Sequence, residues 1–521
     1  MSCNYSIYTG TVGTSLPPKL NLSPMLLDSI PKLDLGSQDK IHEEVLEMLS
    51  KDGSFDADIL FLGAGPGGYV GAIRAGRMGA KTVIVEKAAV GGTCLNVGCI
   101  PTKALLSTVE IVDNVKRSGD FGIDIGGFSI DFPKIIDRKD KIVQQLRKGV
   151  ELLLKRENAR LVQGVGKIVD PHTVEVETAD GAKERITAKN IVIATGSVPA
   201  LLPLPGFEVG GAVWTSTEAL SARSIPKSLL VVGGGYVGLE FGYAYAKLGT
   251  EVTVVEMLPK LLVNMDIELA KELEKSLKKA GLKIKTGAAV LRAEDSAIGK
   301  KVIFKNADGV EEEIEVEKVL LSIGRKPNTA NIGLESVGIS TERGRIIVND
   351  RMQTNVSGIY AIGDCVGNPM LAHVAFHEAT VAVANCLGED KHMSYKAVPG
   401  VVFTHPEVAS VGMTEEDARE RYGDENIRVG KFPFIANGKA LGMGEKEGFA
   451  KVIADAKYGE ILGVHIIGPH ATDMIAEAAL AIQSEATIDD IEATIHPHPT
   501  LSEPIHEAAL DTQGMALHKG A

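Results

Sequence analysis

Two glycine-rich segments predict an α/β chain with two Rossmann-like nucleotide-binding domains and a C-terminal α+β domain. Each segment has the pattern Gly-x-Gly-x-x-Gly, and each lies between a short apolar stretch and a helix-forming stretch. The copies begin at Gly63 and Gly233, 170 residues apart, and in both an acidic residue follows the first glycine by 23 residues. From about residue 397 strand-like stretches alternate instead, which indicates a separate unit on an antiparallel sheet.

The composition restricts the class of protein. With 521 residues the chain is too long for one hydrophobic core, and its net charge of −13 argues against nucleic-acid binding. Its five cysteines are too few for a secreted protein held by disulfides, so a reducing compartment fits. Because we find neither a continuous apolar run of about 18 residues nor a signal-peptide pattern, we expect a bacterial cytoplasmic protein without a membrane span.

Residues 1–55 differ in composition from the rest and are expected to form an extension. Their first part is rich in Ser, Pro, Gly and Thr, which is typical of a flexible tether. The stretch from Asp39 to Lys51 then has apolar residues at helical spacing. It is too short for a lipoyl domain, so two hypotheses remain: a disordered extension with one docked helix, or an anchor for a partner in a multienzyme complex.

The first glycine pattern lies in a predicted strand–turn–helix–strand unit. The first strand contains Ile59 to Leu62, the helix ends near Met78, and the second strand runs from Lys81 to Val85. In such a unit the first glycine allows a tight turn, the second lets a pyrophosphate approach the backbone, and the third lets helix and strand pack closely. The terminal acid accepts hydrogen bonds from a ribose. These roles fall on Gly63, Gly65, Gly68 and Glu86.

The second pattern repeats the unit. Its strand is Ser228 to Val232, its helix Leu239 to Leu248, and its second strand Glu251 to Val255. The corresponding site residues are Gly233, Gly235, Gly238 and Glu256. Two complete units imply two dinucleotides. The acid at Glu256 would repel a 2′-phosphate and so favours NAD over NADP, against which Lys260 is a weak counter-signal.

Two cysteines, Cys94 and Cys99, lie between a glycine pair and a helix-forming run that starts at Lys103. A nearby helix N-terminus favours the thiolate, which is the species that attacks a disulfide or a flavin. We interpret the pair as a redox-active disulfide, with two structural cysteines as the alternative; a zinc site would need two further ligands, and none lies nearby. A two-electron relay through a dithiol needs an acceptor and a mobile carrier, and FAD and NAD fill these roles.

Three later segments also carry polar groups at the ends of apolar stretches. Ile191 to Ile193 and Leu320 to Ile323 each end in a small-residue turn and are expected to close the two nucleotide units. The strand before Asp364 places an acid where it could bind a ribityl hydroxyl, or where it ends an ordinary strand.

In the C-terminal part, strands are expected at Gly400 to Phe403, Ala450 to Ala454 and Gly463 to Ile467, with a helix at Ala471 to Ser484.

The last motif is His496-Pro497-His498-Pro499-Thr500-Leu501-Ser502-Glu503. Histidine is the natural proton carrier near neutral pH, and a carboxylate on one ring nitrogen fixes its tautomer. On its own the motif also fits an exposed turn. In a protein with a redox-active dithiol, a histidine of this motif could carry protons, because oxidation of a dithiol releases them.

From about residue 56 to its C-terminus the chain resembles the dihydrolipoamide dehydrogenases, which belong to the class I pyridine nucleotide-disulfide oxidoreductases. The resemblance is carried by the cysteine segment Gly91 to Leu106, by His498 to Glu503, and by Met370 to His373. It implies an extension (1–55), an FAD-binding domain in two parts (56–199 and 325–396), an NAD-binding domain (200–324) and a dimerisation domain (397–521).

The resemblance also implies residue roles. Cys94 would exchange with the lipoyl sulfur, and Cys99 would contact the flavin. His498 would deprotonate dihydrolipoamide, oriented by Glu503 and contributed by the other subunit of a homodimer. The His498–Pro499 bond would be cis, and Lys103 would pair with Glu240 beside the flavin. The implied FAD contacts are Gly63, Gly65, Gly68, Glu86, Lys103, Gly166, Ala194, Thr195, Gly196, Asp364, Met370, Leu371, Ala372 and His373, and the NAD contacts are Gly233, Gly235, Gly238, Glu256 and Gly324.

The implied activity is oxidation of protein-bound dihydrolipoamide to lipoamide with reduction of NAD⁺. The partner would be a lipoylated acyltransferase or the carrier protein of a glycine cleavage system. The alternatives are a glutathione reductase-like enzyme, whose NADP preference conflicts with Glu256, and a non-catalytic flavoprotein anchor. Mercuric reductase would require cysteines in the C-terminal tail, and soluble transhydrogenase would lack the cysteine pair. We interpret Cys3, Cys365 and Cys386 as structural or incidental.

Overall fold

The computed structural model describes residues 55–367 and 369–519. Residues 1–54 form one unit of the chain and residues 55–521 a second, and the account below concerns the second. The predicted helix from Asp39 to Lys51 and the residue Cys3 lie outside the described residues.

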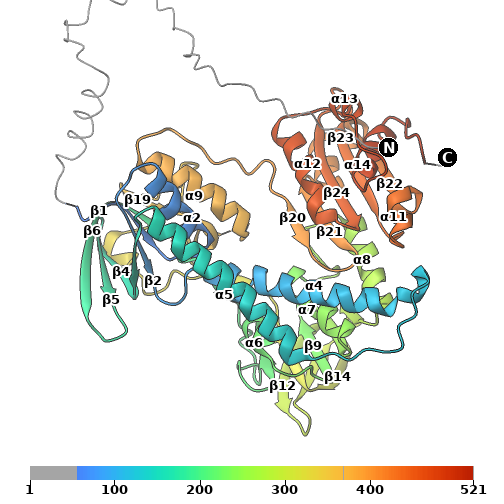
Figure 1. The fold of residues 1–521 in the computed structure, drawn as a ribbon, viewed down its shortest axis with the longest axis horizontal. Helices are drawn as coiled ribbons and strands as arrows, with labels where there is room; N and C mark the ends of the chain where they lie inside the picture. The colour runs from blue at the N-terminus through green and yellow to red at the C-terminus, as the bar shows by residue number, and fades with distance from the viewer. Residues whose placement is uncertain (1–54, 368, 520–521) are drawn as a thin grey trace, which may run out of the picture. The chain divides into compact units, whose positions relative to one another are not determined.

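A seven-stranded sheet carries the first glycine turn (Figure 1). Its order is β3-β2-β1-β6-β5-β4, and β19 pairs with β6, so a strand from much later in the chain completes the sheet. Strands β3, β2, β1, β6 and β19 are parallel, and β4 and β5 continue from β6 as antiparallel strands. The bounds are β1 (Ala57–Leu62), β2 (Thr82–Glu86), β3 (Arg160–Gln163), β4 (Val165–Asp170), β5 (Thr173–Glu177), β6 (Lys183–Ile193) and β19 (Ile359–Ala361).

The central strands of the parallel part, β1 and β2, are mostly apolar and buried, as expected of strands that are covered on both faces. In β1 every residue except Asp58 is buried. Helices α2 (Pro66–Arg77) and α9 (Ala372–Cys386) pack against each other beside this sheet.

A five-stranded parallel sheet carries the second glycine turn, in the order β11-β10-β9-β15-β8. Its strands are β8 (Val213–Trp214), β9 (Ser228–Val232), β10 (Glu251–Glu256), β11 (Lys283–Thr286) and β15 (Lys318–Leu321). The associated helices are α6 (Ser216–Ser221), α7 (Tyr236–Lys247) and α8 (Ile267–Lys279). Three shorter antiparallel pairings involve β12 (Ala289–Asp295) with β13 (Lys300–Lys305) and β14 (Glu311–Val316), β7 (Ser197–Pro199) with β16 (Arg325–Pro327), and β17 (Thr341–Glu342) with β18 (Arg345–Ile346).

The C-terminal part is built on a five-stranded antiparallel sheet in the order β20-β21-β24-β23-β22. Helix α12 packs on β21 and β24, and helix α14 on β22 and β23. The bounds are β20 (Gly400–Val402), β21 (Glu407–Gly412), α10 (Glu415–Tyr422), β22 (Ile427–Pro433), α11 (Gly438–Gly442), β23 (Phe449–Asp455), β24 (Ile461–Gly468), α12 (Ala471–Gln483), α13 (Ile488–Ala493) and α14 (Glu503–Asp511).

The predicted α/β fold class, with two Rossmann-like units and an antiparallel C-terminal unit, is confirmed. Two local predictions were wrong. The second turn's helix starts at Tyr236 rather than Leu239, and the helix expected from Lys103 already starts at Cys99. A short separate helix, α3 (Gly92–Val97), precedes it and contains Cys94.

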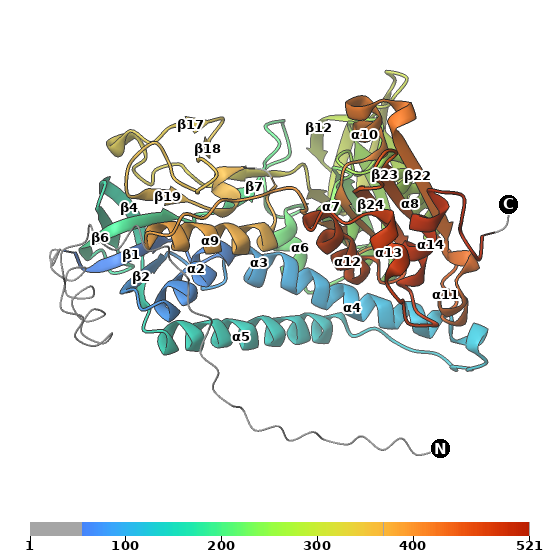
Figure 2. The same ribbon diagram turned by 90° about the horizontal axis from the view of Figure 1, so that it is seen from above.

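Two long helices, α4 (Cys99–Lys116) and α5 (Phe132–Arg156), lie side by side (Figures 1 and 2). The sequence analysis did not anticipate α5, although Asp131 caps it by accepting a hydrogen bond from the Lys134 N–H. Within the described residues, only the stretch 92–116, which is α3 plus α4, is long and apolar enough for a membrane span. In this structure α4 packs against α5 and α7.

A buried lysine joins the C-terminal sheet to the second nucleotide unit. Lys451 on β23 is 1% exposed, and its Nζ lies 2.9 Å from Asp266 Oδ2, 3.0 Å from Glu268 Oε2 and 2.5 Å from Glu415 Oε2. Asp266 caps α8 by accepting from the Glu268 N–H. Buried charges need partners, and here Lys431 and Arg419 also pair with Glu268 and Glu415, so that the cluster holds three cations and three carboxylates.

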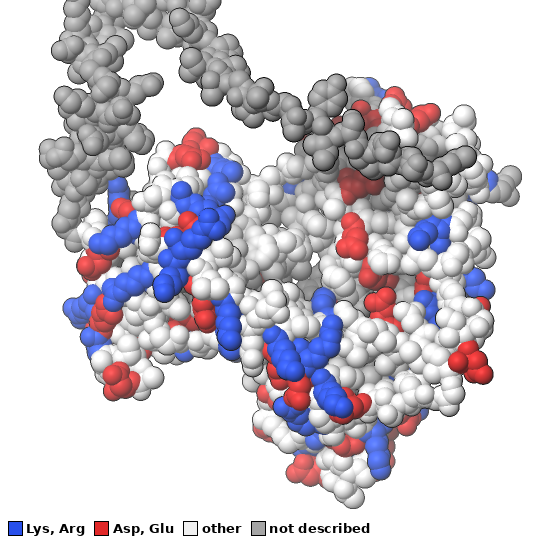
Figure 3. Space-filling model, viewed as in Figure 1, with Lys and Arg blue, Asp and Glu red and all other residues white. Residues whose placement is uncertain are grey.

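Charged side chains of both signs are interspersed over the described part of the face shown in Figure 3. Lys and Arg lie beside Asp and Glu on this face, consistent with the overall net charge of −13.

Candidate active site

The first glycine turn has the shape of a phosphate-binding turn. Gly63 has φ +110°, and a Cβ there would lie 2.4 Å from the carbonyl oxygen of Ala194. A Cβ at Gly68 would lie 1.8 Å from the Gly63 oxygen, so helix α2 can approach β1 only with glycine at this position. Gly65 is the N-cap of α2 and provides no side-chain cap, which leaves the first N–H groups of the helix available to an anion.

Glu86, at the end of β2, faces this turn. Its Oε2 accepts from the Ala64 N–H at 2.8 Å and its Oε1 from the Ala88 N–H at 2.8 Å. The residue is 8% exposed, so these two hydrogen bonds hold the carboxylate in one orientation. Each oxygen keeps a lone pair for the hydroxyls of a ribose.

The segment after β6 closes the first site. Thr195 Oγ1 is buried and has no hydrogen-bond partner among the described residues, as expected of a group that awaits a ligand. Gly196 has φ +71° and leaves open space beside it. Gly166 on β4 is needed for packing, because a Cβ there would lie 2.5 Å from Leu62 Cδ1. These features fit a dinucleotide such as FAD.

Asp364 follows β19, in a 3₁₀ turn, and is held from two sides. Its Oδ2 accepts a short hydrogen bond from Ser197 Oγ and lies 3.9 Å from Arg325 Nε. Next to it, the N–H of Gly363 donates to Glu378 Oε2 on α9. Helix α9 begins at Ala372, so Met370 to His373 lie at its N-terminus, where His373 Nε2 contacts the Pro399 carbonyl oxygen at 3.0 Å.

Two glycines allow the cysteine pair to lie close to the first turn. Gly91 and Gly92 both have positive φ, and a Cβ at Gly92 would lie 2.6 Å from the Cα of Gly65. Close contact of two glycine backbones therefore brings α3 onto the turn. Gly98 lies between α3 and α4. A Cβ there would lie 2.9 Å from the Thr93 carbonyl oxygen, so the backbone can pass this close only with glycine at the position.

Cys94 and Cys99 lie next to each other, and their side chains hydrogen-bond. The hydrogen bond from Cys94 lowers the pKa of Cys99 to about 7, and the Lys103 ammonium adds to this effect. The same hydrogen bond, together with burial, raises the pKa of Cys94. Cys99 is the first residue of the 18-residue helix α4, whose dipole also favours a thiolate.

Lys103 is held by Glu240 of α7. Its Nζ lies 2.9 Å and 2.8 Å from the two carboxylate oxygens, and Glu240 Oε1 also accepts from the Phe403 N–H at 3.0 Å. The Glu240 side chain is 5% exposed. Lys103 thus stands one helical turn after Cys99 and is paired with Glu240, which the backbone N–H of Phe403, just after β20, also holds.

The second glycine turn repeats the first in its backbone but not in its surroundings. Gly233 has φ +110°, and its Cβ would lie 2.5 Å from the Ser322 oxygen. Glu256 Oε2 accepts from the Gly234 N–H at 2.6 Å and Oε1 from the Leu258 N–H at 2.7 Å. At Gly238 a Cβ would meet the Gly233 oxygen at 2.4 Å, whereas Gly235 and Gly324 border open space. This arrangement fits a second dinucleotide such as NAD.

His498 and Glu503 form a hydrogen-bonded pair at the start of α14. His498 Nδ1 lies 2.7 Å from Glu503 Oε1, and Glu503 Oε2 accepts from the Thr500 N–H at 2.8 Å. Although burial alone would raise it, the hydrogen bonds from His498 and Thr500 lower the pKa of Glu503. The His498–Pro499 bond is cis, as predicted, and His405–Pro406 is a second cis bond that was not predicted.

The structure brings the cysteine pair, Lys103 and the first turn together, but it does not place His498 with them. The His498 side chain is 80% exposed, and its hydrogen-bond partner among the described residues is Glu503. It belongs to the C-terminal sheet unit, whereas the cysteines belong to α3 and α4. Its Nε2 therefore remains available to a group from outside this chain.

Arg325 was missed as a site residue. Its guanidinium donates to Ser197 Oγ at 2.7 Å, to the Ser197 carbonyl at 2.9 Å and to Thr93 Oγ1 at 3.3 Å. Arg325 therefore links the segment after β15 to the segment after β6, and also to helix α3, which contains Cys94. A signal was present, since Arg325 directly follows Gly324, but only the fold shows which groups it meets.

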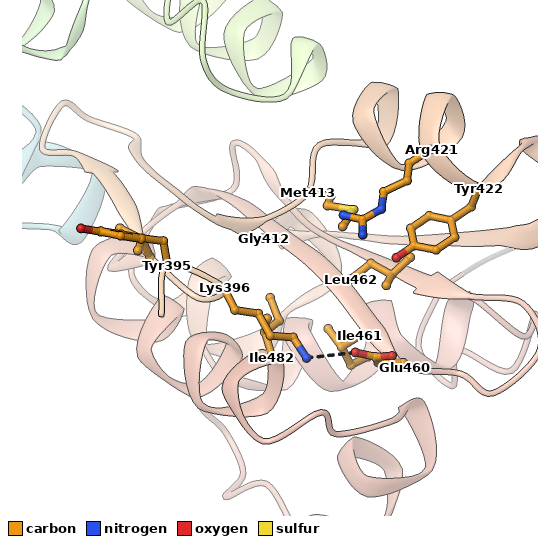
Figure 4. A pocket seen from close by; sticks show the side chains of 11 residues that line it. Tyr395, Lys396, Gly412, Met413, Arg421, Tyr422, Glu460, Ile461, Leu462 and Ile482 are labelled. Carbon is orange, nitrogen blue, oxygen red and sulfur yellow. Dashed lines mark hydrogen bonds and ion pairs between the residues drawn. The ribbon is translucent and has the colours of Figure 1, made fainter. Parts of the chain in front are cut away.

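A pocket of about 510 Å³ opens in the C-terminal part (Figure 4). Lys396 points into it and pairs with Glu460 at 3.2 Å. None of the predicted site residues lines it, so this pocket is separate from the candidate active site. Its lining comprises Tyr395, Lys396, Val398, Gly412, Met413, Arg421, Tyr422, Glu460, Ile461, Leu462 and Ile482.

Comparison with known proteins gives a consistent result. The family described as "Pyridine nucleotide-disulphide oxidoreductase" matches residues 57–379, and its dimerisation domain matches residues 398–509. The chain is 43% identical to dihydrolipoyl dehydrogenase 1, mitochondrial, of Arabidopsis thaliana over 90% of this chain and 93% of the relative. It is 44% identical to dihydrolipoyl dehydrogenase of Bacillus subtilis over 88% and 99%. The crystal structure of LpdA from Mycobacterium tuberculosis superposes with a TM-score of 0.80 at 28% identity, covering 87% of this chain and 98% of that one.

Proposed function

Because the chain belongs to the pyridine nucleotide-disulphide oxidoreductase family, we infer that it catalyses the dihydrolipoyl dehydrogenase reaction. It oxidises protein-bound dihydrolipoamide to lipoamide and reduces NAD⁺ to NADH. The main observation that supports this function is the hydrogen-bonded pair of Cys94 and Cys99, which lies against the first nucleotide turn because Gly92 contacts it closely.

The enzyme uses FAD and NAD. FAD, when bound at the first turn, would supply an acceptor for the two electrons of the dithiol and a hydride donor for NAD⁺. We assign FAD to the first turn, with Glu86 on the ribose, Thr195 and Asp364 closing the site, and Lys103 held beside it by Glu240. We assign NAD to the second turn, with Glu256 on its ribose. The domain boundaries given above belong to the same proposal.

Proton removal starts the dithiol half of the reaction. Nε2 of His498 takes a proton from one thiol of dihydrolipoamide, while Glu503 holds the opposite ring nitrogen and stabilises the resulting imidazolium. Glu503 suits this role because its lowered pKa keeps it ionised at neutral pH.

Two exchange steps follow on sulfur. The substrate thiolate attacks Cys94 of the oxidised pair, a bond forms between the two sulfurs, the Cys94–Cys99 bond breaks, and the electron pair stays on Cys99. The sulfur of the second substrate thiol then attacks the first substrate sulfur and its proton passes to Cys94, so that the bond to Cys94 breaks, Cys94 leaves as a thiol and lipoamide is released. A pKa near 7 makes Cys99 a good leaving group in the first step.

The active form is a homodimer, consistent with the dimerisation domain at residues 398–509. We propose that His498 serves the cysteine pair of the second subunit, because its ring is exposed and lies in the C-terminal part of the chain, whereas Cys94 lies on α3. The lipoylated partner, either an acyltransferase or a glycine cleavage carrier protein, and the cytoplasmic location remain predictions.

The test is an anaerobic assay of the purified yellow protein with dihydrolipoamide and either NAD⁺ or NADP⁺. We expect rapid reduction of NAD⁺ and little of NADP⁺. Replacing Cys94→Ser or Cys99→Ser should lower the rate on the order of a thousandfold or more, because the exchanging thiol or the electron-donating thiol is lost. Cys386→Ala on α9 is the matched control and should retain the rate.

Two outcomes would contradict this function. Slow turnover of dihydrolipoamide, with rapid oxidation of NADPH by glutathione disulfide, would assign a different disulfide substrate to the same fold. Full biological function of both cysteine variants would indicate a non-catalytic flavoprotein.

A further inference from the structure

A second histidine–carboxylate pair precedes the proposed base by two residues. His496 Nε2 lies 2.7 Å from Glu477 Oε1 on α12, the same distance that separates His498 from Glu503. The two histidines differ in exposure, since the His496 side chain is 7% exposed and that of His498 is 80% exposed. The reaction steps described above use His498 and leave His496 without a role.

Both ring nitrogens of His496 face hydrogen-bond acceptors. Nδ1 lies 2.9 Å from the Thr494 carbonyl oxygen, and Nε2 faces the Glu477 carboxylate. Both nitrogens are therefore engaged within this chain, and neither is available to take a proton from a substrate. His498 has the opposite arrangement, because its Nδ1 is bound while its Nε2 has no hydrogen-bond partner within residues 55–367 and 369–519.

The His496 ring also contacts the helix that follows the loop. Its centroid lies 5.0 Å from that of His506 on α14, the helix that begins at Glu503. His496 thus joins the start of the loop to α12 through Glu477 and to α14 through His506. The other end of the loop is held by Asn437, whose Nδ2 donates to the Thr500 oxygen at 3.0 Å.

We propose that His496 and Glu477 form a positioning pair that fixes the loop carrying His498, so that Nε2 of His498 is aimed at dihydrolipoamide. The proposal rests on the proposed function of His498. Positioning matters because the base reaches out of its own chain and its exposed ring has one anchoring hydrogen bond, so a small displacement of the loop moves Nε2 directly.

The test compares two half-reactions in the holoenzyme. The first is reduction of the enzyme by dihydrolipoamide, which needs His498. The second is oxidation of NADH with ferricyanide as acceptor, which needs the second nucleotide turn but not His498. For His496→Ala and Glu477→Ala we expect kcat/KM for dihydrolipoamide to fall about tenfold to hundredfold, with the NADH–ferricyanide rate unchanged.

Two further variants separate positioning from general damage. His496→Gln keeps an N–H that can donate to Glu477, so it should recover part of the dihydrolipoamide rate. His470→Asn is the matched control: it removes an exposed histidine beside Asp473 at the start of α12, and asparagine tolerates the positive φ of that position. It should behave as the unaltered enzyme.

Unchanged dihydrolipoamide kinetics in both alanine variants would overturn the proposal, and so would an equal loss of both half-reactions in both variants. Failure of the unaltered enzyme to oxidise dihydrolipoamide would instead overturn the proposed function, so the two failures are distinguishable.

Discussion

The two glycine turns share a backbone and differ in what covers them. Gly63 and Gly233 have the same φ of +110°, and Glu86 and Glu256 each accept two backbone hydrogen bonds. The middle glycine marks the difference. Gly65 lies against Gly92 of the cysteine segment, whereas in the described part of the chain no heavy atom lies within 4 Å of the Cβ position of Gly235.

The acids differ in the same sense. Glu86 is buried, with 8% of its surface exposed, whereas Glu256 is half-buried. The first turn is enclosed by α3, and the second opens towards solvent. One local pattern therefore serves two purposes: an enclosed turn suits a cofactor that stays bound, and an open turn suits a nucleotide that exchanges in each cycle.

The strongest way to break this contrast is to add one methyl group to each middle glycine. Gly65→Ala should fold, since its Cβ would lie 3.9 Å from the nearest backbone atom, but the methyl group would occupy the path of the FAD pyrophosphate. We expect FAD affinity to fall on the order of a hundredfold, measured as flavin absorbance of the purified protein. Gly235→Ala should retain FAD and raise only the KM for NAD⁺.

Equal flavin content in both alanine variants would show that enclosure does not distinguish the turns. Loss of flavin from Gly235→Ala alone would reverse the assignment of the two dinucleotides.

The part of the molecule around the enclosed first turn also contains a buried carboxyl group. Its protonation makes the free energy of unfolding depend on pH, which gives a further test of the contrast between the two turns. Glu378 is 2% exposed, and burial raises its pKa to about 7 although Tyr395 and the Gly363 N–H both donate to it. At a pH between the pKa of Glu378 in the unfolded chain and its pKa in the folded protein, the folded protein holds a proton that the unfolded chain has lost. The free energy of unfolding should therefore fall as the pH rises from about 4.5 to 7, by at most roughly 3 kcal/mol.

Glu378→Gln should remove this part of the pH dependence, because a neutral amide can still accept from Gly363 and contact Tyr395. The measurement is the Tm of the FAD-loaded protein between pH 5 and 8. Glu389→Gln, at an exposed position just after α9, is the control and should keep the original slope. An unchanged slope in Glu378→Gln would mean that other groups produce it.

The smallest expected effect is at the open turn. Glu256→Gln keeps one oxygen as an acceptor but removes the charge, so it should weaken the ribose contact and the repulsion of a 2′-phosphate together. We expect the ratio of kcat/KM for NAD⁺ to that for NADP⁺ to fall about tenfold, which corresponds to about 1.4 kcal/mol. Steady-state kinetics with both nucleotides measures it, and a constant ratio would show that another residue selects the nucleotide.

The sequence by itself determined the features that depend on near neighbours. The glycines of both turns, the acids at Glu86 and Glu256, the cysteine pair and the motif from His498 to Glu503 are each decided by residues within a few positions or within one strand–turn–helix unit. Backbone conformation and spacing therefore identify them without knowledge of the fold.

Only the tertiary structure decided which distant groups meet. The contacts of Arg325, the burial of Glu378, the pairing of His496 with Glu477 and the cluster around Lys451 join residues far apart in the chain. No local pattern specifies such partners, because each pairing depends on how sheets and helices pack. The placement of α3 on the first turn belongs with these, since it depends on contact between Gly92 and Gly65.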